Sequence, residues 1–206
     1  MFLKIGPALA AGLVVALNPG ARGEPSDSKE ISFANPETAI LELYVGPWAV
    51  AETHYNPRGD VVATVKGSEE IKWVLDERAV QRTYITSSAS NVYRAMSLLA
   101  WDDVQKSYRG IWLDNASTKG PSSLVGRWQP ESQTMIFTVN AQNADGSKAE
   151  FKIVERFVDP ETRAATTYRV DDKGVVKLLE VEYKRTTPCP GRLRIIFDGL
   201  SDGPRG

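Results

Sequence analysis

The sequence predicts an all-β protein, a single antiparallel up-and-down β-barrel of about ten strands, and three observations lead to this fold class. Apolar and polar residues alternate with period two through most of the chain after Trp48, which is typical of half-buried strands. Every connector between these segments is hairpin-sized, so neighbouring strands should pair antiparallel. Only one short segment has helical character. Such a sheet is expected to close, because closure removes its exposed edges; a two-sheet sandwich is the alternative.

The first residues have the outline of a signal peptide. Lys4 precedes an apolar run over residues 5–17, and Asn-Pro-Gly at 18–20 ends it. The run is shorter than the roughly 20 residues that span a bilayer, and Ala21-Arg22-Gly23 supplies small residues for cleavage. We therefore expect a signal peptide at 1–23, a linker at 24–34 and an exported protein, periplasmic or extracellular. An uncleaved amphipathic anchor is the alternative.

Charge and cysteine content exclude several classes of function. The formal net charge is −1, and removal of the leader takes away Lys4 and Arg22 but no acid, which brings it to −3. Because acidic and basic residues are interspersed, nucleic acid is not an expected partner. Cys189 is the only cysteine, so no internal disulfide can form. The rest of the chain suits one domain, expected at 35–185 and followed by a tail at 186–206.

The elements of this domain follow from turn and capping signals. Asn35-Pro36-Glu37 places a capping residue, a proline and an acid at the start of a short helix, which Gly46 should end. Clusters of turn residues then separate the candidate strands. These are Pro47–Tyr55, Val61–Leu75, Ala79–Ser87, Val92–Trp101, Ser107–Leu113, Ser123–Gln129, Thr134–Asn140, Ala149–Val158, Arg163–Val170 and Val175–Arg185. Gly67 is expected to form a bulge in the second strand.

A set of aromatic and charged residues carries a family resemblance. Gly46-Pro47-Trp48 is similar to the Gly-x-Trp start of lipocalin-type barrels. It is followed by Trp101-Asp102, Lys106, Tyr108, Trp112 with Asp114, Gly126 with Trp128, and Tyr183-Lys184-Arg185. This order resembles domain-of-unknown-function family 1579, a calycin-like group related to lipocalins and fatty-acid-binding proteins, over about Glu37 to Arg185. The resemblance implies a barrel and no established activity; Asn115 departs from the expected serine.

The resemblance also implies how one end of the barrel closes. Lipocalin-like barrels often pack the first-strand tryptophan beneath an arginine of the last strand, and Trp48 and Arg185 match those positions. Tyr183 belongs to the same closing set. A guanidinium over an indole contributes about 0.5–2 kcal/mol, so we interpret these residues as structural.

Strand periodicity predicts which side chains face the interior. If Trp48 points inward, Val50, Glu52 and His54 do so too. Phe151, Ile153, Glu155 and Phe157 form a second inward set, and Val175, Lys177, Leu179, Val181 and Tyr183 a third. Aromatic walls with a few charged groups suit a small amphipathic or hydrophobic molecule. The predicted ligand-binding residues are Glu52, His54, Trp112, Trp128, Phe151, Glu155 and Phe157.

Other functions stay open at this point. A filled barrel would be an interaction module of the cell envelope, His54 as the only histidine could hold haem, and an enzyme would use Glu52, His54 or Glu155 as general base. No motif predicts a catalytic residue, a cofactor or a metal site. A cavity of roughly 300 Å³ or more, open at one end, would favour ligand binding over the module. Glu69 and Glu70 face opposite sides of a strand and are interpreted as solvated charge.

Overall fold

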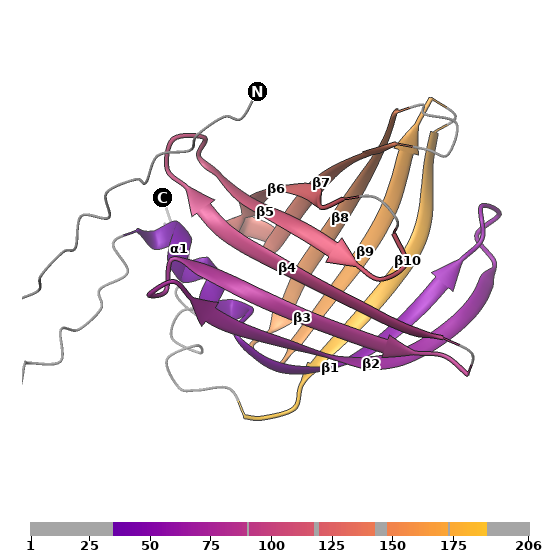
Figure 1. Cartoon of the computed structure of the whole chain (residues 1–206), viewed down its shortest axis with the longest axis horizontal. Coiled ribbons are helices and arrows are strands. Elements are labelled where there is room, and N and C mark those ends of the chain that lie inside the picture. Colours follow the sequence, from indigo (N-terminus) through magenta and orange to yellow (C-terminus); the bar gives the residue numbers. More distant parts are fainter. Residues whose placement is uncertain (1–34, 90, 118–119, 143–147, 173, 189–206) are drawn as a thin grey trace, which may run out of the picture. The chain divides into compact units, whose positions relative to one another are not determined.

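The described part of the chain is one closed antiparallel barrel. The structure, a computed structural model, describes residues 35–89, 91–117, 120–142, 148–172 and 174–188. These residues form ten antiparallel strands preceded by a short helix, which confirms the predicted fold class (Figure 1). The predicted leader, the linker and the tail beyond residue 188 lie outside the described residues. Among the described residues, no helix has the length and apolarity to cross a membrane.

Each strand pairs with its neighbours in the chain, and the last strand closes the barrel on the first. The strand ends agree with the predicted ones to within two residues, and the strand Ala79–Ser87 has the predicted bounds. The strands are β1 (Gly46–Tyr55), β2 (Val61–Val74), β3 (Ala79–Ser87), β4 (Val92–Asp102), β5 (Ser107–Asp114), β6 (Ser122–Gln129), β7 (Thr134–Gln142), β8 (Lys148–Asp159), β9 (Thr162–Asp171) and β10 (Gly174–Arg185).

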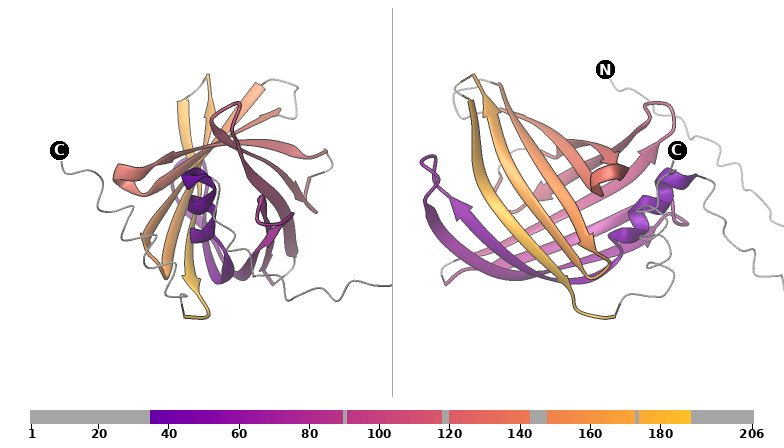
Figure 2. Two further views of the ribbon diagram at one scale, coloured as in Figure 1. Left: turned by 90° about the vertical axis from the view of Figure 1, so that its left-hand side faces the viewer. Right: turned by 180° about the vertical axis from the view of Figure 1, so that it is seen from behind.

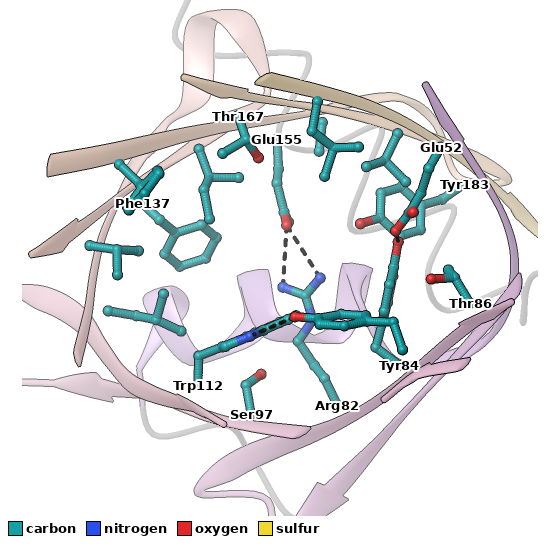
Figure 3. Close-up of a pocket in the computed structure, with 18 of the residues that line it drawn as sticks. Glu52, Arg82, Tyr84, Thr86, Ser97, Trp112, Phe137, Glu155, Thr167 and Tyr183 are labelled. Atoms are coloured by element: carbon teal, nitrogen blue, oxygen red, sulfur yellow. Dashed lines mark hydrogen bonds and ion pairs between the residues drawn. The ribbon is translucent and has the colours of Figure 1, made fainter. Parts of the chain in front are cut away.

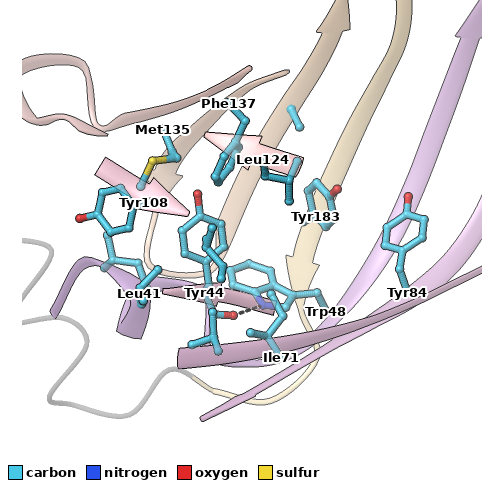
Figure 4. Close-up of a cluster of buried hydrophobic side chains, with 14 of the residues drawn as sticks. Leu41, Tyr44, Trp48, Ile71, Tyr84, Tyr108, Leu124, Met135, Phe137 and Tyr183 are labelled. Atoms are coloured by element: carbon cyan, nitrogen blue, oxygen red, sulfur yellow. Dashed lines mark hydrogen bonds between the residues drawn. The ribbon is translucent and has the colours of Figure 1, made fainter. Parts of the chain in front are cut away.

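A short helical segment covers one end of the barrel, which we call the closed end (Figure 2). It consists of α1 (Pro36–Ile40) and the 3-10 turn η1 (Leu41–Leu43), and the Asn35 side chain accepts the Glu37 backbone N–H at 2.8 Å, as predicted. Its buried residues join the core between the strands (Figure 4). Strand side chains hold it in place, since the Tyr108 hydroxyl donates to the Glu37 carbonyl at 2.7 Å.

Two glycines of the first hairpin allow close approach of other groups. Gly46 opens β1 with φ +124°, and a Cβ there would lie 2.6 Å from Nη1 of Arg185. The bulge predicted at Gly67 is wrong, because this residue pairs in regular register with Val50 and Thr86. Glycine is needed at position 67 because a side chain would not fit there: a Cβ would collide with the Ile85 carbonyl oxygen.

A bulge in β10 corrects the third predicted inward set. Lys177 pairs with Tyr168, but Leu179 already pairs with Thr167, so Leu178 is an extra residue in the strand. One extra residue reverses the alternation of side chains on one side of the bulge. Leu179 therefore lies on the inner wall, whereas Lys177 pairs with Glu180 and Val175 is exposed.

Candidate functional site

The barrel encloses a cavity of about 540 Å³ between the closed end and the opposite, open end, where the β1–β2 and β3–β4 turns lie. It is larger than the roughly 300 Å³ that marks a ligand site. The side of the cavity formed by β6–β9 is mainly apolar and includes Leu124, Phe137, Val139, Phe151 and Ile153. The side formed by β1 and β3–β5 carries most of the polar and aromatic groups (Figure 3).

A ring of four buried charges lies on the closed-end side of the cavity, and two of them, Arg82 and Glu155, line its floor. Arg82 of β3 donates from Nε to Glu69 of β2 at 2.9 Å and from Nη1 to Glu155 of β8 at 3.2 Å. Arg163 of β9 donates to the same two carboxylates, to Glu155 at 3.4 Å and to Glu69 through a short contact. We call these residues the ion-pair ring. It contains two cations and two anions, so its formal charge is zero.

The partners of Glu155 and Arg82 within the ion-pair ring favour their charged forms. Burial pushes the pKa of Glu155 upward, but the guanidinium groups of Arg82 and Arg163 outweigh burial and hold the pKa below its usual value. Burial likewise opposes the charged form of Arg82, and the two carboxylates raise its pKa well above the ordinary value. The Arg163 guanidinium also lies against aromatic rings, with Cζ 3.9 Å from the ring centroid of Tyr183 and 5.0 Å from that of Trp48.

The ion-pair ring corrects one interpretation of the sequence. Glu69 and Glu70 do face opposite sides of β2, but only Glu70 is solvated. Its side chain is 55% exposed and pairs with Lys72, whereas the Glu69 side chain is 0% exposed. Glu69 can be buried because Arg82 and Arg163, which lie on other strands, both pair with its carboxylate. The alternation of residues along β2 alone does not reveal these partners.

Below the ion-pair ring, the closed end is built around Trp48. The indole donates from Nε1 to the Tyr44 carbonyl at 2.8 Å, and Cζ of Arg185 lies 4.1 Å from the indole centroid. The same guanidinium donates to the carbonyls of Leu43 at 2.9 Å and Pro160 at 3.0 Å. Arg185 thus ties the helical segment, the last strand and the β8–β9 turn together.

A carboxylate and a group of aromatic rings form the polar wall of the cavity (Figure 3). Glu52 of β1 is 6% exposed and accepts the Tyr84 hydroxyl at 2.5 Å on one oxygen and contacts Nε2 of His54 at 2.8 Å through the other. Burial, reinforced by the nearby Tyr183 and Glu52, raises the pKa of Tyr84, so its hydroxyl stays protonated and donates. The Trp112 indole donates a hydrogen bond from Nε1 to the Tyr93 hydroxyl at 3.3 Å. Burial also raises the pKa of Tyr93, to about 12.

Ser97 is another inward polar group of this wall. It is 1% exposed, and its Oγ has no hydrogen-bond partner among the described residues. A buried hydroxyl without a partner is unfavourable, and Ser97 is one of the residues that line the cavity.

The cavity brings together most of the predicted ligand-binding residues. Those on its wall are Glu52, His54, Trp112, Phe151 and Glu155. Trp128 and Phe157 do not belong to this lining: their ring centroids lie 6.0 Å apart, and Phe157 packs edge-on against Tyr44. Both residues lie too far along the barrel axis to reach the cavity, because they are on the closed-end side of the ion-pair ring.

Sequence reasoning missed the polar residues of β3. Arg82, Tyr84 and Thr86 alternate along Ala79–Ser87 and face inward together, so period two could have grouped them. The pairing of Arg82 with Glu69 and Glu155 could not be predicted from neighbouring residues, because these partners lie on β2 and β8. Within the described residues, no group of three or more metal-ligating side chains is present.

Comparisons with known proteins agree with this architecture. Residues 34–185 match the family described as "Protein of unknown function (DUF1579)", which confirms the resemblance seen in the tryptophan and tyrosine pattern. The S-type phycobiliprotein lyase CPES from Guillardia theta has a similar structure, with a TM-score of 0.52 and 13% identity, covering 75% of this chain and 95% of the lyase.

A redesigned β-barrel is a more distant match, with a TM-score of 0.37 and 11% identity over 75% of this chain and 98% of its own. Identities this low concern the fold alone. No curated protein matches the sequence.

Proposed function

The chain belongs to the DUF1579 family of proteins of unknown function, and we propose that it binds a small amphipathic molecule inside its barrel. The observation that carries this proposal is the cavity of about 540 Å³ above the ion-pair ring. A packed interior would have favoured the interaction module instead. The molecule would enter from the open end, because the helical segment covers the other.

The two sides of the cavity support an amphipathic ligand. Phe137, Val139 and Phe151 line the apolar side, and burial of apolar surface is the main source of affinity in such sites. The opposite wall presents Glu52, Ser97 and Thr86, whose polar atoms can fix the orientation of the ligand. In this proposal the protein binds or carries its ligand and needs no catalytic group.

Two neighbouring alanines give a matched test. Ala165 lines the cavity, whereas Ala164 faces the other side of β9. We expect the wild-type protein to bind a lipophilic dye, Ala165→Phe to weaken this binding at least about tenfold by filling the cavity, and Ala164→Phe to leave it unchanged. Melting temperatures of both variants report whether they fold.

Native mass spectrometry of protein purified from its own source is the second test. A retained small molecule that Ala165→Phe loses would support the proposal. Repeatedly empty protein that also fails to bind lipophilic dyes would reject it.

We also propose that the protein acts outside the cytoplasm after removal of residues 1–23. The support is the sequence of the leader, with one cation, an apolar run and small residues before Gly23. N-terminal sequencing of the protein from its own source should find a start just after Gly23. A start at Met1 would overturn this proposal.

A further inference from the structure

The charge balance of the cavity indicates the ligand class within the proposed function. The Arg82 guanidinium and the Glu155 carboxylate reach the floor, but both belong to the ion-pair ring, where each contacts two partners of opposite charge. Arg82 is therefore already compensated and is a poor partner for an anionic headgroup. Any charge preference of the cavity must come from its polar wall.

Glu52 gives that wall a negative charge. Its carboxylate is 6% exposed, and its contacts are the neutral Tyr84 hydroxyl and His54, whose side chain is 39% exposed. A carboxylate has about four acceptor positions, so these contacts leave room for further donors. A buried carboxylate beside an open cavity favours a cationic or donor-rich group there.

Aromatic rings next to Glu52 add to this preference. The ring centroid of Tyr84 lies 6.3 Å from that of Tyr93 and 6.3 Å from that of Trp112, and all three rings line the cavity. Aromatic faces attract organic cations through the ring quadrupole, with tryptophan the strongest. We call Glu52, Tyr84, Tyr93 and Trp112 the aromatic-acid cluster.

We infer that the ligand is a hydrophobic organic cation, with its charged nitrogen at the aromatic-acid cluster and its apolar body against the β6–β9 side. This inference rests on the proposed function. It assigns the site to amines and related cations and excludes carboxylates of the same size, because a carboxylate would meet Glu52 and find Arg82 already paired.

Three probes of equal chain length test the charge preference. Decylammonium, decanol and decanoate are compared by displacement of a lipophilic dye at pH 8, above the range in which histidine side chains ordinarily protonate. We expect decylammonium to bind at least about tenfold more tightly than decanoate, with decanol between them. Binding of decanol without an advantage for decylammonium would overturn the inference and leave the proposed function intact. Failure of all three to displace a bound dye would overturn the inference alone, whereas failure of the dye itself to bind would also count against the proposed function.

Substitutions in the cluster locate the preference. Glu52→Gln keeps an acceptor for Tyr84 but removes the charge, so the ratio between decylammonium and decanoate should fall to the smaller preference that the aromatic rings supply, with decanol binding unchanged. Trp112→Leu should weaken decylammonium more than decanol. The control, Phe137→Leu on the apolar side, should weaken all three probes equally. A preference that Glu52→Gln leaves undiminished would place the cation elsewhere and overturn the inference.

Discussion

The closed end and the open half of the barrel use charged groups in opposite ways. At the closed end, the four charges of the ion-pair ring pair with one another, and Arg185 donates to carbonyls of the helical segment and the β8–β9 turn. In the open half, Glu52 is bonded to a neutral hydroxyl and a partly exposed histidine, and Ser97 has no partner among the described residues.

This difference separates structure from function. Buried charges that are compensated within the protein fix how strands meet, whereas a carboxylate with remaining hydrogen-bonding capacity beside a cavity is suited to a ligand. Substitutions at the closed end should therefore change stability, and substitutions in the open half should change binding. The following predictions test this contrast.

The largest effect is expected from Glu69→Ala. Removing this carboxylate leaves Arg82 and Arg163 with a single buried counter-ion, which should lower the free energy of unfolding by about 3–5 kcal/mol. Urea denaturation measures it. The adjacent Glu70→Ala is the control, because that side chain is exposed and its loss should change stability by less than about 0.5 kcal/mol. Equal effects of the two substitutions would contradict the structural role of the ion-pair ring.

Acid should weaken the same ring. Arg82 and Arg163 hold the pKa of Glu155 below its usual value in the folded protein. As the pH falls, Glu155 therefore takes up a proton in the unfolded state at a higher pH than in the folded state. The stability from this group is present above the ordinary glutamate pKa and is lost as the pH falls through the lowered value of the folded state. Denaturation at a series of pH values should show this decline, and Glu155→Gln should flatten it. An unchanged pH profile in that variant would contradict the assignment.

Arg185→Ala should have an intermediate effect. It removes the guanidinium above Trp48 and the bonds to the Leu43 and Pro160 carbonyls, so we expect a loss of about 2 kcal/mol. Lys184→Ala, which removes an exposed neighbour, is the control. Thermal unfolding compares the two, and an unaltered melting temperature in Arg185→Ala would reject the closing role of this pair.

The smallest effect on stability is expected from Ser97→Ala. Because the hydroxyl has no partner among the described residues, its removal should change the free energy of unfolding by less than about 0.5 kcal/mol. Affinity for decylammonium should nevertheless fall. A large loss of stability with unchanged binding would reverse the contrast between the two ends.

Much of the fold could be predicted because its signals are local. Alternation and turn residues located the strands to within one or two residues, and Asn35 with Pro36 located the helix start. Glu52 and His54 could be placed on the cavity wall because they share a strand face with Trp48. The same reasoning misplaced Lys177, since a bulge leaves no clear sequence signal before the pairing is known.

The alternation of side chains, the hairpin connectors and the tryptophan pattern by themselves determined an antiparallel barrel of this family, because strand periodicity and turn chemistry are properties of neighbouring residues. Which charged residues are buried together depends on the closed barrel and could not be predicted from the sequence. Glu69 and Arg163 are 94 positions apart in the chain, and their pairing depends on strand order and register. Likewise, depth along the barrel axis decided that Glu155 reaches the cavity while Phe157, two residues further on, packs into the closed end.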